Sequence, residues 1–223
     1  MSARSVDRVL DALGGLLLPP RCLLCGRAGQ RPSLDLCGDC ELSLPRPARS
    51  LAASPAALDR DYAPFTYAFP MDHLVRALKY RGQLAVGRVL GSLLAEDALA
   101  LGLHLDVDCL VPVPLHPFRH AGRGYNQAAE IARWAGRALG RQVLEGALRR
   151  TRDTRPQVGL RLAERHGNIE GAFAADTRLA GRRVAIVDDV CTTGSTVAAA
   201  AAAARKAGAV TVDAWCVARA VAP

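Results

Sequence analysis

This sequence is poor in aromatic residues, in lysine and in long apolar stretches. Aromatic residues make up 4% of its 223 residues, and lysine occurs only at Lys79 and Lys206. So few aromatic side chains argue against a dedicated binder of single-stranded nucleic acid, because such proteins stack bases on aromatic rings. No stretch approaches the roughly 20 uncharged apolar residues of a spanning helix, and we therefore expect no membrane span.

The overall composition is that of a folded protein. Hydrophobic residues make up 50% of the chain and charged residues 22%. The first fraction is too high for a disordered chain, and the second is too high for a membrane protein. The length suits one domain of ordinary size together with a small appendage.

Positive charge is concentrated in one arginine-rich segment. The chain has 29 basic and 21 acidic residues, a formal net charge of +8, and residues 119–165 hold eleven arginines against four acids. That segment contributes +7 and the rest of the chain +1. Arginine presents a rigid fork of donors that matches phosphate oxygens. The charge fits nucleic acid, an acidic membrane surface, a phosphate-rich small ligand, or simply a solvated arginine face.

The cysteine count and the first residues of the chain favour a cytoplasmic protein. Seven cysteines are an odd number, and Asp7 and Asp11 interrupt the apolar run that ends at Pro19-Pro20. These features argue against a secreted disulfide framework and against a signal peptide. We expect instead a short amphipathic helix before residue 19 that packs on the body of the protein.

Four of the cysteines form two C-x2-C pairs separated by eleven residues. They are Cys22 with Cys25 and Cys37 with Cys40. Two such thiolate pairs are what a tetrahedral Zn²⁺ site needs. A closed four-thiolate site does no chemistry and serves to fold a piece of chain too small to own a core, so we expect structural zinc.

The chain divides into three parts. Residues 1–45 carry the expected helix and the four cysteines, residues 46–60 are rich in Pro, Ala and Ser and are expected to be a linker, and residues 61–223 form the main domain. In the main domain strand patterns alternate with helical patterns, which implies right-handed crossovers, a parallel sheet and an α/β fold. We expect helices at residues 71–80, 84–100, 126–139 and 196–207 and strands at residues 109–113, 183–187 and 210–217.

The most informative segment follows the strand expected at residues 183–187. The apolar run ends in Asp188 and Asp189, and small polar residues then open a helix. Successive N–H groups at a helix start form a cradle for a phosphate, and Gly194 lets the backbone close on the anion. The two carboxylates suit the vicinal hydroxyls of a sugar, although they would alternatively only cap the helix. No lysine follows the glycine, so this is not a Walker A loop.

This segment resembles the phosphoribosyl-pyrophosphate (PRPP) loop of type I phosphoribosyltransferases. Together with the four cysteines, five further segments make the chain similar to the ComF family of competence proteins from about residue 20 to residue 217. The resemblance implies a parallel-sheet type I phosphoribosyltransferase fold with a small N-terminal zinc ribbon. The segments are Lys79-Tyr80-Arg81-Gly82, Val111-Pro-Val-Pro-Leu115, Arg123-Gly-Tyr-Asn-Gln127, Thr154-Arg-Pro-Gln157-x-x-Leu160 and Arg165-x-x-Asn168-Ile-x-x-Ala-Phe173.

The resemblance also implies roles for the matching residues of the loop. Asp188 and Asp189 would be the catalytic pair and would hold the ribose hydroxyls, and Mg²⁺ would accompany PRPP. The 5′-phosphate would be held by Thr192, Thr193, Gly194, Ser195 and Thr196.

Residues outside the loop receive implied roles as well. Arg119 and Arg123 would face the pyrophosphate, and Asn126 and Gln127 would either bind the ligand or brace the loop. A long polar segment in a compact domain is usually functional, and residues 149–168 would form a hood over the site. The hood would contribute Arg152, Arg155, Gln157 and Arg165. Lys79, Tyr80 and Arg81 are a feature of the family, with capping of a helix end as the alternative role for Lys79 and Arg81.

Two functions follow from the resemblance. One is an accessory of natural competence that binds PRPP, a related sugar phosphate or single-stranded DNA and assists DNA uptake with helicase partners. The other is an active phosphoribosyltransferase of nucleotide or cofactor salvage that transfers phosphoribose from PRPP to an unidentified base. Both functions use the same site, so the loop alone does not separate them.

Overall fold

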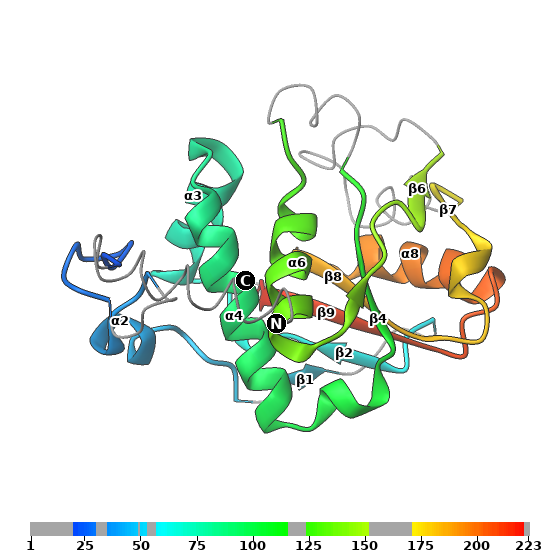
Figure 1. Cartoon of the computed structure of the whole chain (residues 1–223), viewed down its shortest axis with the longest axis horizontal. Helices are drawn as coiled ribbons and strands as arrows, with labels where there is room; N and C mark the ends of the chain where they lie inside the picture. The colour runs from blue at the N-terminus through cyan, green and yellow to red at the C-terminus, as the bar shows by residue number, and fades with distance from the viewer. Residues whose placement is uncertain are drawn as a thin grey trace, which may run out of the picture.

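The computed structural model describes residues 20–29, 35–48, 50–52, 57–115, 124–151 and 171–220 (Figure 1). The amphipathic helix expected before residue 19 lies outside these ranges. Among the described residues, no helix has both the length and the apolar character needed to cross a membrane.

A seven-stranded sheet forms the centre of the protein. Its strands follow the order β1-β2-β9-β8-β4-β5, and β3 pairs with β9 beyond the end of β2. All of these pairings are parallel except that of β1 with β2, so the expected α/β fold with a parallel sheet is confirmed. The strands are β1 Leu51–Ala52, β2 Arg60–Tyr62, β3 Phe65–Thr66, β4 Cys109–Pro112, β5 Gln142–Val143, β8 Arg183–Cys191 and β9 Thr211–Arg219.

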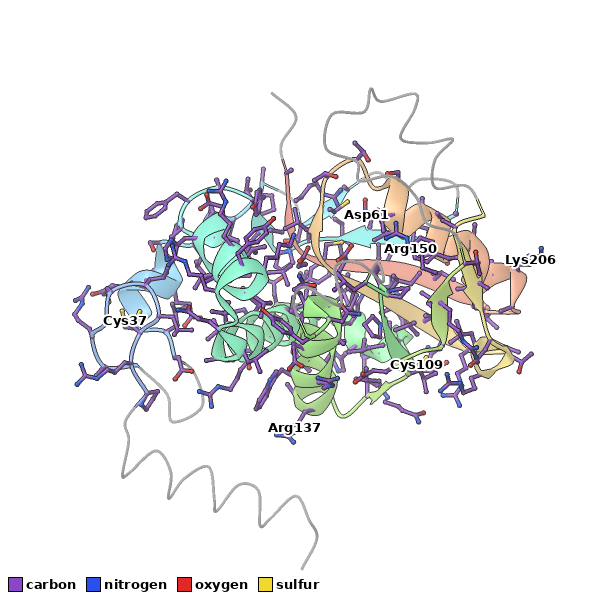
Figure 2. All side chains as sticks on the ribbon, turned by 90° about the horizontal axis from the view of Figure 1, so that it is seen from above. Cys37, Asp61, Cys109, Arg137, Arg150 and Lys206 are labelled. Carbon is purple, nitrogen blue, oxygen red and sulfur yellow. The ribbon has the colours of Figure 1, made fainter. Side chains whose placement is uncertain are left out.

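Helices cover both faces of the sheet. Helices α3 (Met71–Arg81), α4 (Leu84–Ala100) and α6 (Gln127–Leu139) share one apolar core with alternate sheet residues, while α8 (Ser195–Lys206) shares the other core with the intervening ones. Figure 2, seen from above, shows α6 and α8 on opposite sides of the strands. Side chains of a strand alternate between the two faces, which is why a strand buried on both faces, such as β8, is almost continuously apolar up to its acids.

Small residues allow the helices on the first face to approach closely. A Cβ atom on Gly91 of α4 would lie 2.5 Å from the carbonyl oxygen of Ile131 on α6. Glycine is therefore required at this crossing. On the other face, Ala200, Ala201 and Ala204 of α8 are fully buried against the sheet. The alanine run thus serves the packing of α8.

The N-terminal cysteine segment is docked onto the main domain. Leu36 and Cys37 are buried in the same apolar core as α3 and α4, and Asp35 forms an ion pair with Arg88 of α4. The range expected to be a linker, residues 46–60, is also packed where it is described. It supplies β1, and Arg46 binds Asp97 at 2.6 Å.

A separate two-stranded ribbon carries the segment expected to be the hood. Strands β6 (Leu148–Arg150) and β7 (Phe173–Ala175) pair antiparallel, and the N–H of Thr151 donates to the carbonyl of Ala172 at 2.9 Å. The described residues on either side of 152–170 are therefore close together.

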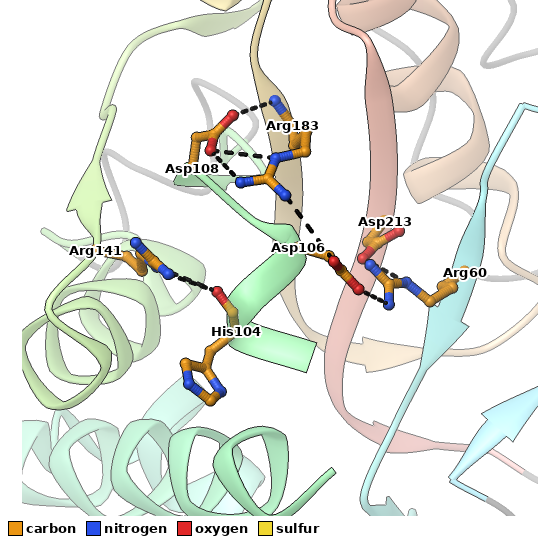
Figure 3. Close-up of polar contacts among 7 residues, drawn as sticks. All are labelled: Arg60, His104, Asp106, Asp108, Arg141, Arg183 and Asp213. Carbon is orange, nitrogen blue, oxygen red and sulfur yellow. Dashed lines mark hydrogen bonds and ion pairs between the residues drawn. The ribbon is translucent and has the colours of Figure 1, made fainter. Parts of the chain in front are cut away.

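Ion pairs tie the strands together at the edge where they begin (Figure 3). Arg183, the first residue of β8, donates to Asp108 just before β4, with an Nη2–Oδ1 distance of 2.8 Å. Arg60 of β2 contacts Asp106 at 2.9 Å and Asp213 of β9 at 3.0 Å. This edge is the opposite end of the strands from Asp188 and Asp189, so its charges serve the sheet.

Candidate functional site

The site forms where β8 extends beyond its neighbour β4. The ladder between these strands ends at the pair Pro112 and Val187, followed by a bond from the N–H of Val113 to the carbonyl of Val187 at 2.9 Å. Strand β8 then continues to Cys191 beside β9 alone. We expected the strand to stop at Val187, but the length of β9, which pairs as far as Arg219, prolongs it.

This position is a topological switch point of the sheet. Strand β4 is followed by β5 on one side, whereas β8 is followed by β9 on the other. Open α/β sheets bind ligands in the crevice outside the carboxyl ends of such strands. Asp188 and Asp189 lie in β8 just beyond the last pair with β4, and the start of α8 follows.

The two carboxylates of the site differ in their surroundings. Asp189 is buried, and Asp188 is partly buried and accepts a hydrogen bond from the N–H of Asp189 at 2.8 Å. Burial, helped by the negative charge of Asp189, raises the pKa of Asp188 to about 7, and the charge of Lys79 opposes this rise. Burial favours the neutral form of a carboxyl group, and a second carboxylate nearby does the same.

Lys79 of α3 enters the site from outside the sheet. Its Nζ atom lies 2.9 Å from Oδ1 of Asp189. Burial alone would lower the pKa of Lys79, but the negative charge of Asp189 outweighs it and the pKa is raised. The structure thus brings together one residue of the Lys79-Tyr80-Arg81 motif and the acidic pair. Tyr80 and Arg81 are exposed on the last turn of α3.

The contact between α3 and the site has a second anchor. The hydroxyl of Tyr125, just before α6, donates to the carbonyl of Leu78. Leu78 is itself fully buried in the core. Sequence reasoning missed both contacts, although one signal was present: Lys79 is one of only two lysines among 29 basic residues.

Asn126 and Gln127 begin α6 at the edge of the site. Asn126 caps the helix by accepting from the N–H of Ala128 at 3.0 Å, and its Nδ2 donates to the carbonyl of Val113 at 2.9 Å. Both of its polar atoms are used, which favours a bracing role. Gln127 is 2% exposed, and its Nε2 atom has no hydrogen-bond partner among the described residues.

The loop after β8 presents the open start of α8. Gly194 has φ +75°, a conformation that side chains disfavour, and it directly precedes Ser195, the first residue of the helix. Oγ1 of Thr193 and Oγ of Ser195 lie 2.9 Å apart. The first N–H groups of a helix have no partner within it, so the start of α8 is suited to an anion.

Cys191 lies at the end of β8, where the loop begins, and is buried. Its Sγ accepts from Nη1 of Arg219 at 3.3 Å, and Arg219 also pairs with buried Asp61. A hydrogen bond with Cys216 and the charge of Arg219 lower the pKa of Cys191 to about 7, against the effect of burial. This sulfur braces β8 against β9 and faces away from solvent.

Several predicted site residues lie outside the described ranges. The structure therefore does not test the roles expected for Arg119, Arg123, Arg152, Arg155, Gln157 and Arg165.

The four N-terminal cysteines form a compact cluster. Their sulfur atoms all lie within 4.8 Å of one another, and those of Cys25 and Cys37 are 3.6 Å apart. Zn–S bonds of about 2.3 Å in a tetrahedron place sulfurs roughly 3.8 Å apart, so the cluster fits a metal such as zinc. Hydrogen bonds from the backbone and side chain of Arg27 lower the pKa of Cys25 to about 6, which favours the thiolate that a metal needs.

Two known proteins are similar to this chain over most of its length, although no family model matches it. It is 34% identical to the DNA utilization protein YhgH of Escherichia coli O157:H7 over 205 residues, 89% of each chain, and 31% identical to competence protein F of Haemophilus influenzae over 222 residues, 96% of this chain and 97% of that protein.

Among solved structures, the chain is similar to a purine phosphoribosyltransferase of Pyrococcus horikoshii Ot3, with a TM-score of 0.34 and 18% identity over 58% of this chain and 70% of that chain. The glutamine PRPP amidotransferase of B. subtilis, complexed with ADP and GMP, matches with a TM-score of 0.40 and 21% identity over 57% of this chain and 25% of that chain. At that TM-score the likeness says nothing about activity. The identity over nearly the whole length of both relatives is decisive, and the chain belongs to the ComF family, together with competence protein F and the DNA utilization protein YhgH.

Proposed function

We propose that the protein binds PRPP or a related sugar phosphate where β8 ends and α8 begins, and that it is an accessory of DNA uptake. The observation that carries this proposal is the position of two carboxylates near the end of β8, where only residues 190–194 separate them from the open start of α8. A pair of acids beside an anion cradle suits a ligand that has hydroxyl donors at one end and a phosphate at the other.

Each part of the site has a task in binding. Asp188 and Asp189 accept from the ribose hydroxyls, and the amides and hydroxyls of residues 192–196 hold the 5′-phosphate. In the sequence, Arg119 and Arg123 follow β4, the neighbour of β8, and they face the pyrophosphate. The hood residues Arg152, Arg155, Gln157 and Arg165 close over it.

Magnesium accompanies PRPP in this proposal. Mg²⁺ commonly binds substrate phosphates and keeps several of its waters, so it would bind the pyrophosphate while Asp188 and Asp189 accept from the ribose hydroxyls. When bound, Mg²⁺ neutralises part of the charge of the pyrophosphate.

Zinc belongs to the four-cysteine cluster and has a structural role. The sulfur spacing supports a closed tetrahedral site made by Cys22, Cys25, Cys37 and Cys40. Such a site adds to the apolar packing that docks this segment onto the main domain.

A thermal shift experiment tests the PRPP site. Added PRPP with Mg²⁺ should raise the Tm of the parent protein, because a ligand that binds only the folded state stabilises it. The rise should vanish in the double variant Asp188→Asn/Asp189→Asn, which keeps the shape of both side chains. No shift in the parent protein would overturn the assignment of the site.

The place of the site in DNA uptake rests on the relatives. One is named a competence protein and the other a DNA utilization protein. We propose that this chain acts in the cytoplasm in the same process, with single-stranded DNA and a competence helicase as partners. The arginine-rich segment at residues 119–165 supplies the positive charge that such a partner requires.

An active transferase is the second candidate, because the same carboxylate pair can stabilise a sugar cation. The bond from C1 of the ribose to pyrophosphate breaks, and pyrophosphate leaves with the electron pair. A ring nitrogen of a base then bonds to C1 and loses its proton to solvent. Asp188 and Asp189 lie beside the positive centre and stabilise it electrostatically.

Pyrophosphate release measured against a panel of bases separates the two candidates. Release that depends on one base would establish a transferase. Binding of PRPP without release would favour the accessory role.

A further inference from the structure

The strongest unassigned feature of the molecule is the buried ion pair between α3 and β8. Nζ of Lys79 lies 2.9 Å from Oδ1 of Asp189, and the two side chains are 23% and 9% exposed. Helix α3 lies, together with α4, in the connection that leads from β3 to β4 of the parallel sheet. The last turn of this connecting helix supplies a cation to a carboxylate near the end of β8.

Capping of the helix end does not explain this lysine. A lysine in the last turn of a helix commonly interacts with the free carbonyl groups there. Lys79 is in the last turn of α3, yet its ammonium group meets a carboxylate on another element. Gly82, with φ +66°, ends the helix instead. Lys206, the other lysine of the chain, lies exposed in the last turn of α8 and represents the ordinary case (Figure 2).

The backbone around Lys79 is fixed, so the pair has a defined geometry. Leu78 is fully buried, and its carbonyl accepts from the hydroxyl of Tyr125, which lies next to Asn126 at the start of α6. The ammonium therefore stays against Asp189 without rearrangement of α3. Fixed charges of this kind cost no reorganisation when a ligand arrives.

The charge balance of the site depends on Lys79. Two adjacent carboxylates would repel each other and any phosphate that approaches them. The charged and titratable groups that act on Lys79 are Asp189, Asp188 and Tyr67. Those that act on Asp188 are Asp189, Lys79 and Cys191, and Cys216 of β9 is paired with Asp188 in the sheet. Lys79 supplies the positive charge against the acidic pair, and it lowers the pKa of Asp188.

We propose that Lys79 is a positioning residue that makes the acidic pair an acceptor for the vicinal hydroxyls of an anionic sugar phosphate. It binds one oxygen of Asp189, which leaves the other oxygen for a hydroxyl group. This inference rests on the proposed sugar-phosphate site and adds helix α3 to it.

Calorimetric titrations of the full chain with ribose 5-phosphate and with inorganic phosphate test the inference. Phosphate alone uses only the loop, whereas the sugar phosphate also needs the carboxylates. In Lys79→Met, affinity for ribose 5-phosphate should fall by roughly tenfold or more, as expected for the loss of one charge-assisted contact, while affinity for phosphate changes far less. Lys79→Arg should restore much of the difference, and Lys206→Met should change neither affinity.

The pH profile distinguishes positioning from a purely structural role. Binding of ribose 5-phosphate falls as pH decreases, because protonated carboxyl groups accept hydroxyl hydrogen bonds poorly. The charge of Lys79 lowers the pKa of Asp188, so in Lys79→Met the midpoint of this fall should move to higher pH. A structural role would lower Tm and leave the midpoint unchanged.

The outcomes separate this inference from the function on which it rests. If the parent protein binds no ribose 5-phosphate, the proposed function fails and the inference fails with it. If the parent binds and Lys79→Met keeps its affinity and its pH midpoint, only the role of Lys79 is overturned. An equal loss for both ligands would also overturn it, since Lys79 would then act on the phosphate alone. Should Lys79→Met fail to fold, Lys79→Gln and Lys79→Arg provide the same comparison.

Discussion

Arg219 joins Cys191 to Asp61 across three strands of the sheet. Its Nη1 atom lies 3.3 Å from Sγ of Cys191 on β8, and its Nη2 atom pairs with Oδ1 of Asp61 on β2. The side chain of Asp61 is only 3% exposed. The loop after β8 thus starts from a strand end that Arg219 and the buried carboxylate of Asp61 hold on its sheet side.

The variant Arg219→Met should destabilise the protein strongly. The substitution leaves the buried carboxylate of Asp61 without its cation, and breaking a buried pair in this way costs about 3 kcal/mol or more. Urea unfolding measures the change as a lower midpoint at an unchanged slope. Arg178→Met is the matched control, because the Arg178–Asp176 pair, at 2.7 Å, lies at the surface and its loss should cost under about 1 kcal/mol. Equal effects of the two substitutions would contradict the role of the network.

Asp188 should make the free protein less stable as pH rises. Its pKa in the folded state is raised to about 7, so the folded protein binds more protons than the unfolded chain between about pH 4 and pH 7. Its contribution to stability is complete below that window and is lost as pH rises through 7. Asp188→Asn should remove this loss and raise the free energy of unfolding at pH 8 by at least about 1 kcal/mol.

The same variant should bind no PRPP, so stability and binding should change in opposite directions. Urea unfolding at pH 5 and at pH 8 gives the stability comparison, and Asp176→Asn serves as the control. A hydrogen bond from the backbone of Arg178 lowers the pKa of Asp176. Asp176 therefore stabilises the folded protein more as pH rises, which is the opposite of the effect of Asp188. If the free energy of unfolding changes equally between pH 5 and pH 8 in Asp188→Asn and in the parent, the raised pKa of Asp188 is refuted.

Metal analysis should find about one zinc ion per chain. The double variant Cys37→Ser/Cys40→Ser should contain none, because two thiolates do not hold the metal in a closed site. A strong chelator should lower the Tm of the parent protein and leave that of the double variant unchanged. Cys109→Ala is the control, since Cys109 is a buried thiol of the sheet, outside the metal cluster, and should keep the metal.

Binding of single-stranded DNA, if it uses the arginine-rich segment, should weaken steeply with salt. The logarithm of the affinity should fall linearly with the logarithm of the salt concentration, with a slope of about −0.7 for each phosphate contact. Arg152→Gln/Arg155→Gln should make the slope shallower, and PRPP should compete with the DNA. Fluorescence anisotropy with a labelled oligonucleotide measures both effects. Undetectable binding at low salt would remove DNA as a direct partner.

The sequence predicts the long elements of the fold well. The helices expected at residues 84–100 and 126–139 agree with α4 and α6 to within a residue, because each carries an apolar face along its whole length. The short strands β1, β3 and β5 have two residues each and leave no periodic signal. Strand β3, for example, exists only through its pairing with β9, about 150 residues further along the chain.

The site is predicted in part for the same reason. Asp188, Asp189 and the loop up to Thr196 are consecutive, so their meeting follows from local sequence. The contact of Lys79 with Asp189 joins residues more than a hundred positions apart, and a helical pattern gives no sign of which strand end the last turn of α3 will reach. The hydrogen bond from Asn126 to the carbonyl of Val113 likewise depends on how α6 is placed over β4.

The bond between Thr151 and Ala172 means that the two ends of the segment between them are already closed by β6 and β7. The entropy of closing a loop depends only weakly on its length, about 0.6 kcal/mol for each doubling. Insertions, deletions or a transplanted sequence at residues 152–170 should therefore leave the rest of the fold almost undisturbed. Evolution or protein engineering can therefore exchange the segment that the β6–β7 ribbon closes without rebuilding the sheet.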